Sequence, residues 1–183
     1  MSKAILFFAD GLEECEGLLV VDLLRRAGIT VQTVSVSGRA EVTSAHNVTL
    51  RCDAVAETAD LTDADAVVLP GGMPGTTHLA ESALVARTVR SYAAQGKLVA
   101  AICAAPTVLQ EAGVLDAQHH VTCYPSCQME IECNWVDEPV VEHAGVITGQ
   151  APGSAMMFAV VVLSALAGES TAKKVSRGLV FHS

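Results

Sequence analysis

One cysteine of the sequence lies in a setting that could make it reactive. Cys103 ends the apolar run "KLVAAIC" (97–103) and is followed at once by Ala104, Ala105 and Pro106. Small residues at a strand-to-helix junction permit the sharp bend that presents the nucleophile of many hydrolases. A helix N-terminus also favours a thiolate, so this position predicts a thiol pKa below the usual ~8.5. The alternative is a buried structural cysteine, the commoner fate of a lone cysteine in an apolar run.

Glu16 is a second candidate, because the pattern around it places a carboxyl on a buried helix face. In the helix predicted from about Glu13 to Ala27, Leu19, Val20 and Leu23 follow Glu16 at spacings of three and four. A carboxyl turned toward the sheet is partly desolvated, which raises its pKa and lets it hold a proton near neutrality. It could then hydrogen-bond a thiolate or transfer a proton. The alternative, pairing with the helix dipole, suits the glutamates before it better.

A glycine-rich turn supplies unobstructed backbone amides near both residues. The segment "LPGGMPG" (69–75) follows a buried strand, and the N–H of Gly71 or Gly72 could join that of Ala104 in holding an oxyanion. The alternative is an ordinary turn that needs positive φ. Ligands bind beyond the carboxyl ends of the strands in open parallel sheets. This turn, the loop after the first strand and Cys103 should therefore meet at one edge.

The elements that would position these residues alternate along the chain. Strands are predicted within 4–9, 30–36, 65–72 and 97–103, and helices over 13–27, 77–95, 152–167 and 169–180. A helix should begin near Pro106, a hairpin should occupy 42–52, a short strand His120–Thr122, and a second hairpin should surround Gly145. This alternation predicts an α/β fold with a largely parallel sheet. A length of 183 residues fits one domain over 1–183.

Composition narrows the class of protein. Hydrophobic residues make up 51% and charged residues 17%, which favours a globule over disorder. The net charge is −9 without a basic stripe, so we expect no binding to nucleic acid or to anionic membranes. The longest apolar stretch, "AMMFAVVVLSALAG", is too short for a membrane span, and the first residues lack a signal peptide's features. We therefore expect a soluble cytoplasmic protein with free thiols.

Three further cysteines gather in "TCYPSCQMEIEC". The spacing of Cys123, Cys127 and Cys133 lacks the paired C-x-x-C of structural zinc sites, so no metal site is predicted. Cys123 could lie near Cys103 and act as a secondary, resolving thiol or join a soft-metal site. Cys127 and Cys133 are better explained as core residues or incidental surface thiols.

The order and spacing of several segments resemble a known family. "GLEECEG", "VVLPGGMPG", "AAICAAPTVL", "VTCYP" and "GQAPGSAMMFA" are similar to the ThiJ/PfpI superfamily, most of all to its branch containing the parkinsonism-associated deglycase (DJ-one). The resemblance covers nearly the whole chain. It implies a flavodoxin-like, three-layer α/β sandwich, usually a homodimer. It also implies cofactor-independent glyoxalase or deglycase activity on methylglyoxal-like α-oxoaldehydes or their early adducts, and oxidation of the reactive cysteine under oxidative stress.

The resemblance assigns roles to individual residues. It makes Cys103 the nucleophile, Glu16 its acid/base partner, and the amides of Gly72 and Ala104 the oxyanion donors. Animal members carry a histidine where this chain has Tyr124. A tyrosine titrates near pH ~10 and is a poor base at pH 7, so Tyr124 is expected to orient a substrate carbonyl. A mechanism that needs a Cys–His pair is thereby disfavoured.

Two other functions use the same cysteine. One is a redox sensor or chaperone whose Cys103 is oxidised first, with the sulfinate stabilised by Glu16. The other is an amidase or peptidase, which is disfavoured because such relatives place a histidine after the cysteine, where this chain has Ala104. Multiple turnovers would separate an enzyme from a sensor. His46, in the excursion after the second strand, is assigned no role beyond that of a possible neighbour of a partner's site.

Overall fold

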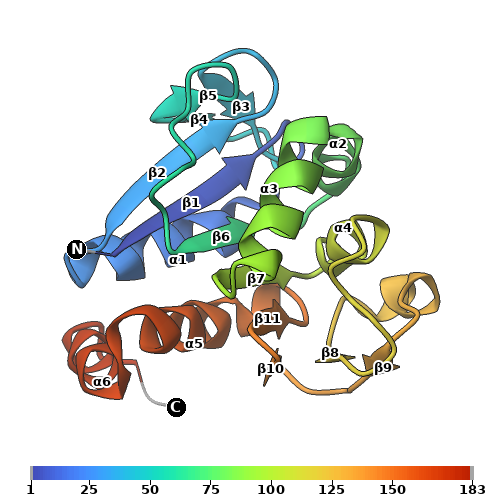
Figure 1. The fold of residues 1–183 in the computed structure, drawn as a ribbon. Helices are drawn as coiled ribbons and strands as arrows, with labels where there is room; N and C mark the ends of the chain where they lie inside the picture. The colour runs from blue at the N-terminus through green and yellow to red at the C-terminus, as the bar shows by residue number, and fades with distance from the viewer. Residues whose placement is uncertain (1, 182–183) are drawn as a thin grey trace.

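A central sheet with helices on both faces forms the frame of the molecule (Figure 1). The computed structural model describes residues 2–181. The sheet order is β10 (Val140–His143), β11 (Val146–Gly149), β7 (Leu98–Ile102), β6 (Ala66–Leu69), β1 (Lys3–Phe8), β2 (Thr30–Ser35) and β5 (Ala54–Val55). Neighbouring strands are parallel except for the β10–β11 hairpin. The largely parallel sheet predicted from the sequence is confirmed.

Each face of the sheet is covered by its own helices. On one face, α1 (Glu14–Arg26) and α5 (Ala155–Ala167) pack over a core that includes Leu6 and Phe8, and α6 (Glu169–Gly178) packs on α5. On the other face, α2 (Gly75–Glu81), α3 (Ala83–Ala94) and α4 (Pro106–Glu111) cover Ile5 and Phe7. Successive residues of β1 thus alternate between two cores, as the period of a strand requires. The three layers confirm the flavodoxin-like sandwich.

Short elements complete the chain at two edges. The hairpin expected at 42–52 is present as β3 (Glu41–Thr43) and β4 (Thr49–Arg51). A second small sheet pairs β8 (His120–Val121) with β9 (Asn134–Trp135), and the 3₁₀ helix η1 (Pro125–Glu130) lies between them in sequence. A 3₁₀ turn, η2 (Pro152–Ser154), precedes α5 where a continuous helix was expected.

The single helix predicted over 77–95 is wrong. The chain leaves the helical conformation at Ser82, where ψ is 107°, and α2 and α3 lie on either side of it. The Ser82 hydroxyl oxygen accepts a hydrogen bond from the N–H of Val85 (3.4 Å), which makes it the N-cap of α3. Serine is favoured there because its side chain satisfies an N–H that has no partner within the helix.

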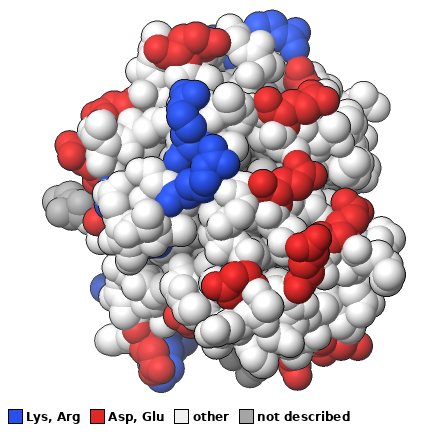
Figure 2. Space-filling model, turned by 45° about the vertical axis from the view of Figure 1, so that its right-hand side comes forward, with Lys and Arg blue, Asp and Glu red and all other residues white. Residues whose placement is uncertain are grey.

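The surface reflects the acidic composition. Figure 2 shows acidic side chains spread over one face, whereas the basic side chains gather in a few places. Across residues 2–181, each helix is too short or too polar to cross a lipid bilayer.

Candidate active site

The backbone bends sharply at Cys103, between β7 and α4. Its φ is +64°, a left-handed conformation that residues with a Cβ rarely adopt and that costs roughly 1–3 kcal/mol. Two hydrogen bonds hold it: the Cys103 N–H donates to the Gly149 carbonyl oxygen (2.9 Å), and the Cys103 carbonyl oxygen accepts from the Tyr124 N–H (2.8 Å). Helix α4 then begins at Pro106. The geometry is that of a strand-to-helix elbow that presents a thiol.

Glu16 reaches this elbow from the first turns of α1. Its side chain is fully buried, and its Oε2 accepts a hydrogen bond from the Gly71 N–H at 2.8 Å. Within residues 2–181, Oε1 meets no donor in hydrogen-bonding geometry, but the Cys103 thiol is close enough to couple the two ionisations. Burial raises the pKa of Glu16 to about 7, against the opposing effects of the Gly71 N–H and of Cys103. A carboxyl that gains or loses a proton near neutrality therefore lies beside the thiol.

The turn at Gly71 and Gly72 leaves space between Cys103 and Glu16, and it supplies backbone N–H groups to both. A Cβ at Gly71 would lie 2.7 Å from the Cys103 Cβ and 2.9 Å from Glu16 Oε2, so only glycine fits between them. The Gly71 N–H is already bound by Glu16. The N–H groups of Gly72 and Ala104 instead face the Cys103 sulfur, where they lower the thiol's pKa. The two backbone donors predicted from the sequence are thus brought to the same atom.

The predicted lowering of the Cys103 pKa is wrong. Burial raises the pKa of Cys103 to about 12, and the charge of Glu16 and its hydrogen bonding add to this rise. The amides of Gly72 and Ala104 lower the pKa but offset only part of the rise. Glu16 therefore loses its proton near pH 7, while Cys103 keeps its own up to about pH 12. Between these values a carboxylate lies beside a protonated thiol.

Tyr124 and Cys123 lie beside the elbow in different ways. The Tyr124 side chain is 44% exposed, and it is the backbone N–H of this residue that contacts Cys103. Cys123 is fully buried in the core on the α2–α4 face, whereas Cys103 belongs to the core on the α1 face. Burial raises the pKa of Cys123 to about 12, and the nearby Cys127 adds to this. The role of Cys123 as a secondary thiol stays a prediction.

A hollow adjoins the elbow on its α2–α4 side. It has a volume of about 300 Å³, and its wall includes Ala104, Thr76, Glu81, Glu111 and Cys127. Cys103 is absent from that wall because its side chain turns toward α1 instead. Here the chemistry of the residues, and not the shape of the surface, identifies the candidate site.

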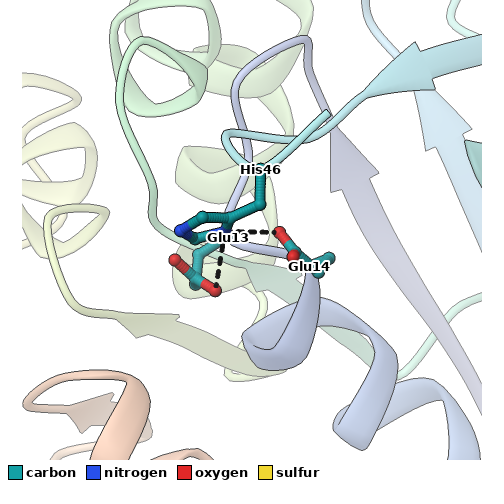
Figure 3. A group of neighbouring side chains, drawn as sticks. All are labelled: Glu13, Glu14 and His46. Atoms are coloured by element: carbon teal, nitrogen blue, oxygen red, sulfur yellow. Dashed lines mark hydrogen bonds and ion pairs between the residues drawn. The ribbon is translucent and has the colours of Figure 1, made fainter. Parts of the chain in front are cut away.

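His46 was assigned no role within its own chain, and the structure places it next to the start of α1. Its Nδ1 lies 3.1 Å from Glu14 Oε2 and 3.7 Å from Glu13 Oε1 (Figure 3). The sequence could not reveal this contact, because it depends on how the β3–β4 hairpin folds over the loop before α1.

A thiol at a strained elbow, paired with a buried carboxyl at the carboxyl edge of a flavodoxin-like sheet, defines a class of cysteine-elbow α/β proteins. Comparison with known proteins narrows this class. The chain belongs to the DJ-1/PfpI family, whose model matches residues 2–165.

Three relatives illustrate the similarity. Protein dj-1beta of Drosophila melanogaster is 38% identical over 184 residues, which cover 98% of each chain. The crystal structure of Drosophila melanogaster DJ-1beta superposes with a TM-score of 0.94, at 36% identity over the whole of both chains. A structure titled Toxoplasma gondii DJ-1, oxidized, has a TM-score of 0.94 at 31% identity, again over both whole chains. The glutathione-independent glyoxalase DJR-1.2 of Caenorhabditis elegans is 30% identical over 170 residues, covering 91% of this chain and 89% of that protein.

Proposed function

We propose that the chain is a cysteine-dependent, cofactor-independent enzyme of the glyoxalase type, which converts methylglyoxal-like α-oxoaldehydes into 2-hydroxy acids. The observation that carries the proposal is the contact between the Cys103 thiol and the buried Glu16 carboxyl, which the Gly71 amide fixes in place. The name of the Caenorhabditis elegans relative supports the same chemistry. Cys103 is the nucleophile and Glu16 the acid/base residue.

The first step forms a carbon–sulfur bond. The Cys103 sulfur attacks the aldehyde carbon of methylglyoxal, and the thiol proton passes through Glu16 to the carbonyl oxygen, which gives a hemithioacetal. Charge that develops on this oxygen is stabilised by the N–H groups of Gly72 and Ala104, which already face the sulfur. A thiol next to a carboxylate needs no free thiolate, because the carboxylate accepts the proton as the bond forms.

The second step moves a proton between adjacent carbons. Glu16 removes the hydrogen from the former aldehyde carbon, and a proton is returned to the neighbouring carbonyl carbon, so one carbon is oxidised and the other reduced. The product is a thioester of lactate on Cys103. Water then hydrolyses this ester, which releases lactate and restores the thiol. One methylglyoxal and one water give one lactic acid, without an external oxidant or reductant.

The remaining expectations belong to this proposal. Early adducts of the same aldehydes would enter by the same attack, which is the deglycase variant of the activity. Tyr124, at the rim of the elbow, would orient the substrate carbonyl. A homodimer and a single domain over 1–183 stay predictions, as does a cytoplasmic location.

Lactate formation from methylglyoxal tests the proposal. Wild type should make many lactates per chain, while Cys103→Ser should lose turnover and Glu16→Gln should lose roughly 10²–10⁴-fold. Cys127→Ser is the matched control, because Cys127 lies in the neighbouring hollow and belongs to the other core. Turnover that survives in Cys103→Ser would refute the mechanism.

The redox sensor is the second candidate, and the oxidised structure of the Toxoplasma gondii relative favours keeping it. A sensor would react with peroxide at Cys103 once per chain and would show no aldehyde turnover. Mass spectrometry of peroxide-treated protein, set beside the lactate assay, separates the two functions. If Cys103 is selectively oxidised to the sulfinate and no lactate forms, the enzyme function is rejected in favour of the redox sensor.

The pH dependence of Cys103 alkylation should reveal the coupling between Cys103 and Glu16. In buffer containing a chelator, the rate of reaction with iodoacetamide should stay low through pH 7 and rise only toward pH 12, because burial and the Glu16 charge hold the pKa of the thiol at about 12. In Glu16→Gln the rise should move to lower pH but stay above 9.0, because the amide removes the charge while burial still raises the pKa of the thiol above that ordinary value. Peptide mapping assigns the alkylated residue. Identical profiles for both proteins would show that the two groups are not coupled.

A further inference from the structure

Glu13, Glu14 and His46 meet in an arrangement that the proposed reaction does not use (Figure 3). The two glutamates come from the start of α1, and His46 comes from the turn between β3 and β4. His46 Nδ1 is 3.1 Å from Glu14 Oε2 and 3.7 Å from Glu13 Oε1. One donor atom from each residue lies within 4.8 Å of the others. The group therefore combines one imidazole nitrogen with two carboxylates from two separate elements.

Two carboxylates meet a single imidazole in this group, at the start of α1, whose dipole offsets part of their charge. The side chains of Glu13 and Glu14 are only 16% and 21% exposed, and in the described part of the chain each makes its ion pair with His46 alone. Two carboxylates held this close repel one another unless a cation lies between them. A neutral imidazole leaves a charge of −2, which a divalent cation would neutralise. His46 is 62% exposed, so an ion can reach the group from solvent.

The backbone fixes the histidine against the helix. The N–H of Ala45 donates to the Leu12 carbonyl oxygen (2.9 Å), which ties the hairpin turn to the residues just before α1. The Ser44 hydroxyl oxygen accepts from the N–H of His46 (3.3 Å) and shapes the turn. The histidine is therefore brought to the two carboxylates by main-chain contacts, which do not depend on the ion pair itself.

We propose that Glu13, Glu14 and His46 bind a divalent transition-metal ion of the zinc type. Zinc binds nitrogen and oxygen ligands at about 2.1 Å, so two ligands of a tetrahedral site lie about 3.4 Å apart. The separations of 3.1 and 3.7 Å bracket this value. An imidazole with two carboxylates suits zinc better than magnesium or calcium, which take oxygen ligands. Three protein ligands leave the fourth position to water.

Cys15 forms a hydrogen bond to one of the proposed ligands, Glu13. Its thiol donates a hydrogen bond to Glu13 Oε1 at 3.4 Å, which orients that carboxylate in the way that outer-shell groups orient metal ligands. The sequence predicts no metal site, because the cysteines lack a zinc spacing and His46 is far from the two glutamates in the chain. His46 lies more than 30 positions after the two adjacent glutamates, so only the fold brings the three side chains together.

Calorimetric titration of chelator-treated, full-length protein with Zn²⁺ tests the proposal. Wild type should bind one ion at this site, and His46→Ala and Glu14→Gln should each weaken binding at least tenfold, while circular dichroism shows an unchanged fold. His119→Ala is the matched control, because His119 makes the same kind of pair with a single carboxylate, Asp116, at 2.9 Å. Zn²⁺ affinity that is unchanged in His46→Ala overturns the proposal.

Anomalous scattering from crystals grown with Zn²⁺ locates the ion independently of affinity. The expected peak lies between His46 Nδ1 and the two carboxylates. A peak only beside Cys103, or only beside the His119, His120 and His143 rings, which pack on one another, overturns the proposal. The position of the peak does not affect the lactate assay, so the metal site and the proposed function are tested independently.

Discussion

Glu16→Gln is expected to raise the free energy of unfolding at pH 8 by about 3 kcal/mol while it lowers turnover roughly 10²–10⁴-fold. The folded chain holds the Glu16 pKa at about 7 by burial, against an ordinary value of 4.5. Below pH 4.5 the carboxyl is protonated in both states. Between pH 4.5 and 7 only the unfolded chain ionises, so the wild type loses stability as pH rises. Above pH 7 the loss is complete, and the neutral amide avoids it.

Urea unfolding of both proteins at pH 4 and pH 8, with a chelator present, measures this effect. The difference should be near zero at pH 4 and largest at pH 8. The amide can keep the hydrogen bond from the Gly71 N–H, so the comparison isolates the buried charge. Glu138→Gln, at an exposed position, is the control and should change little at either pH. A Glu16→Gln protein that is less stable than wild type at pH 8 would contradict the assigned burial cost.

Gly71→Ala should lower turnover roughly 10²-fold even though it adds only one methyl group. The new Cβ would lie 2.7 Å from the Cys103 Cβ, 2.8 Å from the Ile102 carbonyl oxygen and 2.9 Å from Glu16 Oε2. The first two atoms belong to the elbow and cannot move without disturbing β7. Displacement of either reactive group by about 1 Å costs roughly 10²-fold in rate. Overpacking should also cost about 1–3 kcal/mol of stability.

Gly178→Ala is the matched control, because a Cβ there meets no atom within 4 Å and the residue lies in α6. That substitution should leave turnover unchanged and change stability by no more than about 0.5 kcal/mol. Lactate assays and urea unfolding of both variants provide the comparison. A Gly71→Ala protein with wild-type turnover would show that the contact between Cys103 and Glu16 tolerates more space than the structure allows.

Much of the frame could be predicted from local patterns. Strands β6 and β7 are uninterrupted apolar runs, and α1 carries a clear buried stripe, so the sheet and the inward direction of Glu16 follow from periodicity. The helix predicted over 77–95 is divided at Ser82, a break that depends on one capping hydrogen bond to the Val85 N–H. Strands as short as β5 and β9, at two residues each, are too brief to show a period.

The site could be predicted in part, for the same physical reason. The ends of neighbouring parallel strands meet at one edge, which brings the turn after β6 to Cys103. The direction of the Cys103 pKa could not be predicted, because it depends on the balance between burial, the Glu16 charge and two backbone amides. The contact of His46 with α1 depends on the hairpin folding over the loop, which no local pattern encodes.

The two hydrogen bonds that hold Cys103 at positive φ come from Tyr124 and Gly149, both later in the chain. During synthesis the cysteine therefore leaves the ribosome before the partners that bend it. Until β11 pairs with β7, the Gly149 carbonyl oxygen cannot hold the unfavourable conformation, and the residue can relax to an ordinary extended one. The bend at Cys103, and with it the contact of the thiol with Glu16, is thus completed only when the last sheet strand has been placed.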